Sequence, residues 1–117
     1  QFLENEDFSK ADQKYFIELL SELPKKVDVI DSTVANYVDR PIEQLDPVER
    51  AVLRLATYEL LYRPDIPYKV SINEAVQLTR KFGAEQGHAY VNAVLDKAAH
   101  TLRAAECSSA DKQSAGR

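Results

Sequence analysis

The segment KFGAEQGHAYVN, residues 81–92, holds the side chains of this chain that could bind a ligand. A lysine and a phenylalanine precede Gly83, and a second ring, Tyr90, follows it. Aromatic rings with cations beside them suit single-stranded RNA, because bases stack on the rings while Lys or Arg side chains meet the phosphates. The spacing alone leaves two interpretations open. The segment is either an RNA-binding surface or an ordinary corner between two helices, with Phe82 in the core and Tyr90 at its rim.

The helix expected after this corner, about residues 85–104, has two distinguishable faces. Its core side is expected to consist of Gly87, Val91, Val94, Leu95, Ala98 and Leu102. Beside the core side runs a stripe at helical spacing, made of Gln86, Tyr90, Ala93 and Lys97. Lys81 and Phe82 end the preceding helix, and a tight turn at Gly83 should bring them near Gln86. A binding surface here would combine two rings, an amide and two cations.

Other kinds of chemistry find little support in the sequence. Three glycines cannot supply a phosphate-binding GxGxxG loop, and no Walker sequence occurs. His88 and His100 lie 12 residues apart and belong to no recognisable metal-ligand pattern. No serine is placed on a sharp turn as a nucleophile, and the acidic residues read as a solvated surface. The chain is therefore predicted not to be an enzyme and to need neither a cofactor nor a metal.

Few glycines and the spacing of the apolar residues predict an all-α protein. From Phe16 to Tyr37 the apolar residues recur in steps of four and three. This pattern predicts one long helix over about residues 9–39, beginning at Ser9 and kinked near Pro24. The alternative is two helices that meet at the segment ELPKK.

A second helix is predicted to begin at Asp46-Pro47, an N-cap residue followed by a proline at the first helical position. Its apolar residues cover most of its circumference, so it should be central and buried on more than one side. Glu59 lies close to these apolar residues and is expected to be satisfied by a nearby Arg or Tyr.

The third helix is predicted to begin at Ser71, which forms a capping box with Glu74, and to end at Gly83. From residue 106 onward the sequence is small and polar. We therefore expect a helical domain over residues 1–105 and a disordered tail over residues 106–117.

The composition is that of a single soluble globular domain, with 44% hydrophobic and 29% charged residues. No run of about 18 apolar residues could span a membrane, and the segment QFLENEDFSK does not resemble a signal peptide. The single cysteine, Cys107, favours a reducing, cytoplasmic location. The absence of an initiator Met leads us to expect that the natural N-terminus lies further upstream.

The net charge of the 117-residue chain is −4, but it is spread unevenly. Up to Glu49 there are 12 acidic and 5 basic residues, and after it there are 7 acidic and 10 basic residues. The overall acidity argues against a nucleic-acid footprint along the whole chain. The second half nevertheless has room for a local basic face.

Residues 47–99 closely resemble the C-terminal half of the NusB transcription antitermination factors. The similarity is carried by the segments VERAVLRLATYEL, PYKVSINEAV and FGAEQGHAYVNAVLDKAA. The segment from QFLENEDF to KYFIELL also resembles the region that leads into the long third helix of that family. The resemblance implies a compact helical bundle of the NusB type, with about four to five helices in this chain.

The resemblance also implies a function. NusB proteins pair with NusE, a small-subunit ribosomal protein, and the pair binds boxA RNA, so that RNA polymerase reads through terminators in ribosomal RNA operons. Family RNA contacts fall on Phe82, Gln86 and Tyr90, with Lys81 and Lys97 beside them. The family's contact with NusE falls on Glu49, next to Arg50. Some members carry Asp at the position of Gln86, and a neutral amide there should repel phosphate less.

One departure from the family is expected to matter. NusB proteins begin with an arginine-rich first helix and a second helix, and neither is present in this sequence. We therefore expect weaker boxA binding than in a full-length relative. We also expect exposed apolar surface on the long helix and around Val52 and Leu55, which would favour a homodimer or a domain-swapped arrangement.

Two other functions stay open at this point. The chain could be the NusB-like RNA-binding domain of a ribosomal RNA cytosine methyltransferase. It could also be a protein-interaction module that has lost RNA binding.

Overall fold

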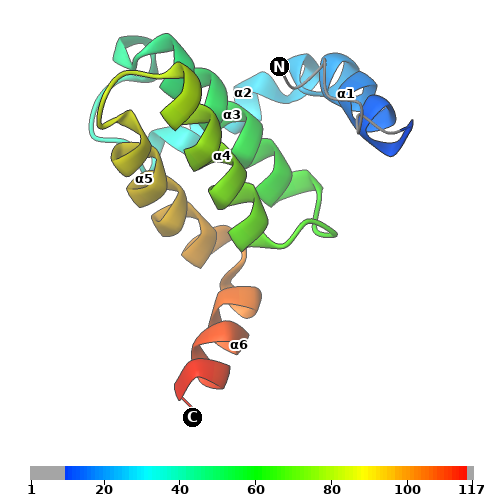
Figure 1. Ribbon diagram of the computed structural model, residues 1–117, viewed down its shortest axis with the longest axis vertical. Coiled ribbons are helices and arrows are strands. Elements are labelled where there is room, and N and C mark those ends of the chain that lie inside the picture. The colour runs from blue at the N-terminus through cyan, green and yellow to red at the C-terminus, as the bar shows by residue number, and fades with distance from the viewer. Residues whose placement is uncertain (1–9, 116–117) are drawn as a thin grey trace.

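The computed structural model describes residues 10–115, which form α-helices and short 3-10 turns with no β-strand in that range (Figure 1). The elements in chain order are α1 (Lys10–Glu22), η1 (Pro24–Lys26), α2 (Val27–Ala35), η2 (Ile42–Gln44), α3 (Pro47–Tyr62), α4 (Tyr68–Phe82), α5 (Gly87–Leu102) and α6 (Ala104–Ala115). The all-α fold class is confirmed. The described residues hold six α-helices rather than the expected four to five, because the predicted long helix divides at Pro24 and the predicted tail forms α6.

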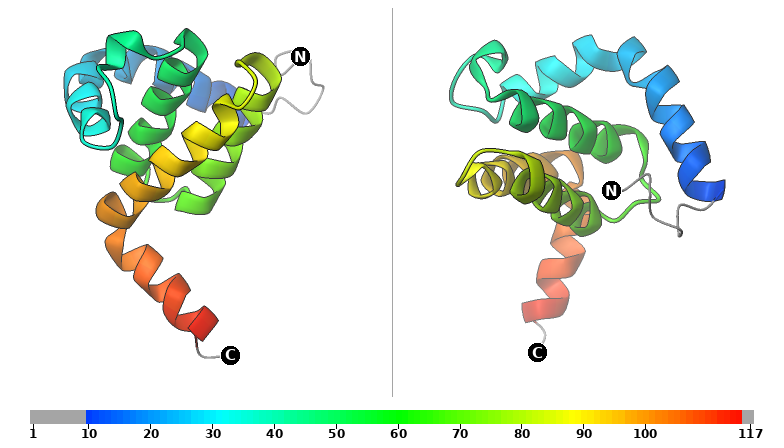
Figure 2. Two further views of the ribbon diagram at one scale, coloured as in Figure 1. Left: turned by 90° about the vertical axis from the view of Figure 1, so that its left-hand side faces the viewer. Right: turned by 45° about the horizontal axis from the view of Figure 1, so that its top comes forward.

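Helix α3 lies at the centre of the bundle and packs against α2, α4 and α5 (Figures 1 and 2). It begins as predicted, since the Asp46 carboxylate accepts the backbone N–H groups of Val48 and Glu49 at 3.0 and 3.3 Å. Its buried residues lie on several sides and include Val52, Leu53, Ala56, Tyr58 and Leu60. The predicted central position is confirmed, and each fully buried large side chain stabilises the fold by roughly 1.5–3 kcal/mol.

The predicted single helix over residues 9–39 is wrong, and the alternative of two helices is correct. Helix α1 ends at Glu22 and α2 begins at Val27, with the 3-10 turn η1 between them. Pro24 has no N–H to continue the helical ladder, and the N–H of Lys26 instead bonds to the carbonyl of Leu23 at 3.0 Å. Helix α2 then ends at Ala35, four residues before the predicted end. The predicted start at Ser9 lies outside the described residues.

Polar contacts attach α1 to the end of α3. The Tyr15 hydroxyl donates to Glu59 Oε2 at 2.6 Å, which confirms that Glu59 is satisfied by a nearby Tyr. The Glu18 carboxylate accepts the Tyr58 hydroxyl at 2.7 Å and Arg63 Nη1 at 2.9 Å. The Arg63 guanidinium also lies 4.6 Å from the centroid of the Tyr15 ring, a cation–π contact. These contacts orient α1 although much of its apolar surface faces solvent.

Arg103 closes the opposite end of α3 from Asp46. Its guanidinium, in a side chain only 8% exposed, donates to the carbonyls of Glu59, Leu60 and Arg63 at 2.9–3.0 Å. These carbonyls belong to the last turn and C-cap of α3, where no further helical N–H is available. Arg103 Nη1 also bonds to Glu106 at 2.6 Å, and Glu106 accepts the backbone N–H of Tyr68 at 3.0 Å.

The predicted boundary at residue 105 does not match a change of structure, because α6 begins at Ala104. Cys107 in its first turn is buried, and its thiol lies 3.5 Å from the carbonyl of Ala99. Glu106 and Cys107 pack against the bundle and stabilise this turn. The small, polar composition of the segment does not predict these contacts. Beyond that turn, α6 extends away from the other helices (Figure 2).

The capping box predicted at Ser71 is also wrong. Helix α4 begins three residues earlier, at Tyr68, and the carbonyl of Pro67 accepts the N–H groups of Val70 and Ser71. Ser71 is therefore inside the helix and buried, and its hydroxyl has no hydrogen-bond partner among the described residues. Two prolines precede Tyr68, and proline favours the start of a helix, so they are the stronger start signal.

We predict that Tyr58→Phe lowers the free energy of unfolding by about 1–2 kcal/mol at pH 7, because Glu18 loses a hydrogen bond. Burial, and then the bond to Glu18, raises the pKa of Tyr58 from 10.0 to about 12. The protonated phenol is thus favoured in the folded chain, and its contribution is lost as the pH rises from 10 to 12. The difference in free energy of unfolding between wild type and variant, measured by urea unfolding, should therefore become smaller between pH 10 and pH 12.

The matched control is Tyr62→Phe, which removes a hydroxyl that bonds to no residue the structure describes. Its effect on the free energy of unfolding should be smaller than that of Tyr58→Phe at pH 7. Equal effects of the two variants would contradict the role assigned to the bond between Tyr58 and Glu18.

Candidate nucleic-acid interface

The corner between α4 and α5 depends on Gly83. This residue ends α4, as predicted, and its N–H bonds to the carbonyl of Thr79 at 2.8 Å. Its backbone is extended, with φ −94°, so it is not needed for a left-handed conformation. A Cβ at Gly83 would instead lie 2.8 Å from the Thr79 carbonyl oxygen, closer than real contacts allow. Glycine is required here because the turn is tight.

Gln86 immediately precedes α5 and has a left-handed backbone, with φ 73°. A side chain in this region costs about 1–2 kcal/mol, so glycine is the usual residue. The Gln86 side chain is exposed and makes no capping hydrogen bond. The corner therefore presents this amide to solvent, and α5 begins at Gly87, two residues after its predicted start.

The N-terminal turn of α3 lies against the start of α5. A Cβ at Gly87 would lie 2.7 Å from Glu49 Oε2, so the missing side chain of Gly87 makes room for this carboxylate. Burial, with a further contribution from Asp46, raises the pKa of Glu49. Arg50 on the same turn donates to the carbonyl of Glu43 at 3.3 Å. The predicted protein-contact residues thus lie at the same end of the bundle as the α4–α5 corner.

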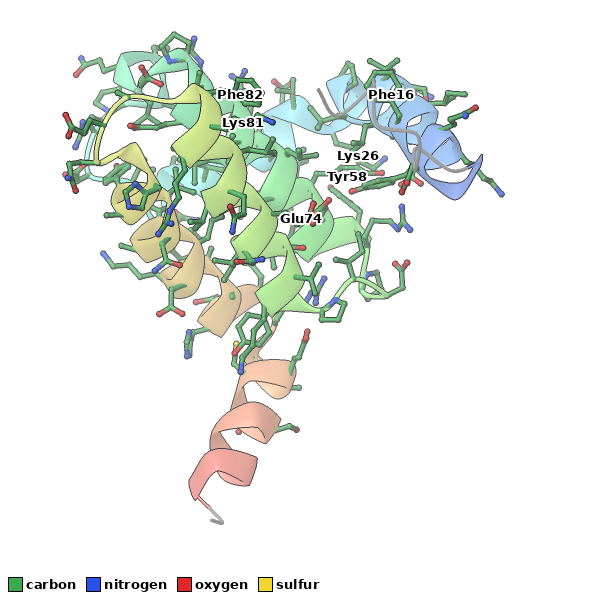
Figure 3. The ribbon with its side chains drawn as sticks, viewed as in Figure 1. Phe16, Lys26, Tyr58, Glu74, Lys81 and Phe82 are labelled. Atoms are coloured by element: carbon green, nitrogen blue, oxygen red, sulfur yellow. The ribbon has the colours of Figure 1, made fainter. Side chains whose placement is uncertain are left out.

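Phe82 is at the surface and not in the core, which excludes the interpretation that placed its ring inside a helix corner. The side chain is 58% exposed, and Lys81 Nζ lies 5.7 Å from its ring centroid. Figure 3 shows both residues at the end of α4. The ring borders an apolar hollow of about 350 Å³ lined by residues of α3 and α4, among them Val48, Leu55 and Leu78. Phe82 therefore offers an aromatic surface with a cation beside it.

Tyr90 is half-buried and faces the loop between α2 and α3. Its hydroxyl donates to Asp39 Oδ1 at 2.9 Å, and the Arg40 guanidinium carbon lies 5.0 Å from its ring centroid. Arg40 in turn donates from Nε and Nη2 to the two oxygens of Asp39, at 2.8 and 3.2 Å. These bonds, first those from Arg40 and then that from Tyr90, lower the pKa of Asp39 to about 2.

Asp39 and Arg40 were missed by the sequence analysis. They lie about 50 residues before Tyr90 in a short polar loop, and no spacing pattern links two segments so far apart. The one available signal is their position directly before Pro41, because a following proline disfavours a helical backbone at Arg40.

The predicted RNA-binding residues fall into four places. Lys81 and Phe82 end α4, and Phe82 borders the hollow between α3 and α4. Tyr90, on α5, faces Arg40. The exposed Gln86 lies in the turn between α4 and α5. Lys97 is exposed on α5, about two turns after Tyr90. The two rings therefore have different neighbours at one end of the bundle, and a single surface that includes all five residues stays a prediction.

Within the part of the chain that the structure describes, no group of three or more His, Cys, Asp and Glu side chains is arranged to hold a metal ion. None of the helices in that part combines the length and apolar character needed to cross a membrane.

The sequence profile of the NusB family matches residues 2–100. The chain is 52% identical over 103 residues to the transcription antitermination protein NusB of Idiomarina loihiensis, an alignment that covers 88% of this chain and 74% of that protein. It is 53% identical over 98 residues to NusB of Pseudoalteromonas atlantica, covering 84% and 70%. A solved structure of T. maritima NusB is similar with a TM-score of 0.74 and 33% identity, covering 81% of this chain and 68% of that one.

We predict that Gln86→Gly raises the free energy of unfolding by about 0.5–1 kcal/mol, because glycine adopts φ 73° without strain from a Cβ. The matched control is Gln77→Gly, at an exposed position inside α4, which should lower stability by about 1 kcal/mol. Thermal unfolding of both variants measures the difference. A loss at both positions would show that the left-handed backbone at Gln86 carries no strain.

Proposed function

The chain belongs to the NusB family and is a non-enzymatic transcription antitermination factor, and on this premise we propose that it binds boxA RNA together with NusE. In this proposal the α4–α5 corner is the RNA surface, and the first turn of α3 is the contact with NusE. The process that the protein serves in this proposal is read-through of terminators by RNA polymerase in ribosomal RNA operons.

The main observation in favour of RNA binding is that the Phe82 side chain is exposed and lies beside Lys81. A large ring 58% exposed at a helix end is a surface on which a base can stack, and the ammonium group beside it can meet a phosphate. Tyr90 with Arg40 provides a second ring with a cation, and the Gln86 amide is available to hydrogen-bond a base edge.

The NusE part rests on the position of Glu49. Its carboxylate lies against the first turn of α5, and Arg50 lies on the same turn of α3. A protein bound there would adjoin RNA at the corner, so one end of the bundle could hold both partners. Because the chain carries a net charge of −4, RNA binding has to come from this local surface and from the partner.

We predict that Phe82→Ala weakens boxA binding by the stacking free energy of one base, about 1–3 kcal/mol. This corresponds to a loss of affinity of roughly 5- to 150-fold. Fluorescence anisotropy with a labelled boxA oligoribonucleotide, with and without NusE, measures this loss. Gln86→Asp should also weaken binding, because a carboxylate at the corner repels phosphate.

The control is Phe16→Ala, which removes another exposed ring, on α1 and away from the corner (Figure 3). It should leave RNA affinity unchanged. Equal losses from the two variants would refute the assignment of the corner. If the wild-type chain adds nothing to the affinity of NusE alone, the chain is a protein-interaction module without an RNA role.

We also propose that two copies of the chain associate through α1. Its exposed apolar residues are Phe16, Ile17 and Leu20, the last two more than 60% exposed. Exposed neighbours of this size favour association. The expected exposure of Val52 is not found, since Val52 is buried within α3, and Leu55 is half-buried. The proposed association surface is therefore α1 and not the central helix.

For this association we predict that Leu20→Glu shifts a concentration-dependent dimer to monomer in sedimentation velocity, because a charge cannot be buried unpaired at the interface. Val70→Glu, at an exposed apolar position on α4, should leave the dimer intact. A wild-type chain that stays monomeric at every concentration would overturn the proposal.

A further inference from the structure

The exposed carboxylate of Asp39, beside the corner, accepts hydrogen bonds from Arg40 and Tyr90, and these two donors could bind a different anion. Asp39 Oδ1 accepts the Tyr90 hydroxyl at 2.9 Å and Arg40 Nε at 2.8 Å, and Asp39 Oδ2 accepts Arg40 Nη2 at 3.2 Å. The side chain of Asp39 is 67% exposed and that of Arg40 is 45% exposed. The donors therefore form a small anion-binding arrangement that is open to solvent.

The donors match an RNA phosphate as well as they match a carboxylate. A guanidinium offers two parallel N–H groups to two oxygens of either anion, and the phenol adds a third donor. Contact with the Tyr90 ring orients the Arg40 guanidinium, and proline at position 41 disfavours a helical backbone at Arg40. The strongly lowered pKa of Asp39 agrees with a site that favours negative charge.

We propose that the Asp39 carboxylate occupies the place of an RNA phosphate, and that RNA binding displaces it so that a phosphate takes the donors of Arg40 and Tyr90. This inference rests on the proposed RNA function and assigns to it two residues that the sequence analysis missed. Arg40 is then a phosphate-binding residue. Asp39 is an internal competitor that lowers the affinity of the free chain for RNA.

Displacement costs little because the pair is at the surface. An exposed ion pair contributes little to stability, so exchanging one anion for another does not disturb the fold. Tyr90 packs on the core through its ring and not through its hydroxyl, so the ring stays in place when Asp39 leaves. Only the short Asp39 side chain has to rotate toward solvent.

A purely structural role for Asp39 predicts the opposite result. If Asp39 served to orient Arg40 toward RNA, removing its charge would weaken binding. If Asp39 competes with phosphate, removing its charge strengthens binding. The sign of the effect of Asp39→Asn therefore separates the two roles.

The experiment measures the affinity of a boxA oligoribonucleotide, with NusE present, for a set of variants of the full chain. Asp39→Asn should bind about 2- to 5-fold more tightly than wild type at low salt. Arg40→Ala should bind about 2- to 5-fold more weakly, with a salt slope reduced by about one phosphate contact. In the double variant the gain from Asp39→Asn should vanish, because Asp39 acts through Arg40.

Asp28→Asn is the matched charge control, since it removes the same charge from an exposed position at the far end of α2. Its effect on affinity should stay well below that of Asp39→Asn. The proposal is overturned if the two variants gain equally, or if Asp39→Asn binds more weakly than wild type. In both cases a loss in Phe82→Ala still supports the RNA function, whereas failure of the wild-type chain to bind RNA removes both proposals.

Discussion

The single guanidinium of Arg103 connects the ends of three helices, and the arrangement of the bundle depends on it. Its side chain is nearly buried, and its N–H groups donate to the carbonyls at the end of α3. Through Glu106 it also reaches the first N–H of α4. An uncovered helix end inside a protein leaves several carbonyls without donors, which is costly. Burial of α3 on several sides is possible because Asp46 and Arg103 satisfy its two ends.

The contacts of Arg103 fix how α3, α4 and α5 lie together at one end of the bundle, and this arrangement determines the geometry of the end that holds the α4–α5 corner. Helices α3, α4 and α5 run side by side, so the first turn of α3 reaches the α4–α5 corner about 24 Å from the Arg103 end of a 16-residue helix (Figure 1). There, Gly83 and Gly87 leave no Cβ between the corner and its neighbours Thr79 and Glu49. The close approach brings Glu49, proposed for NusE, next to the corner proposed for RNA. Local charge at that end then matters more than the acidity of the whole chain.

Much of the fold could be predicted from the sequence, because periodicity and caps are local signals. Asp46-Pro47 and Gly83 gave two helix limits correctly, and the apolar circumference of α3 indicated its central place. The errors at Pro24 and Ser71 arose because the prolines there were stronger local signals than the patterns that were followed. The first turn of α6 has a tertiary cause, because it depends on contacts such as that between Tyr68 and Glu106, which are distant in sequence. The same reason hides Asp39 and Arg40, because only folding brings their loop to Tyr90.

The most direct test of the account is a map of the RNA footprint by backbone amide chemical shifts, recorded while boxA RNA is added to the labelled chain with unlabelled NusE. The account predicts that the RNA-dependent shifts gather in residues 81–90 and in the loop at Asp39 and Arg40. Shifts that gather on α1 or α6 and leave the corner unchanged would contradict it.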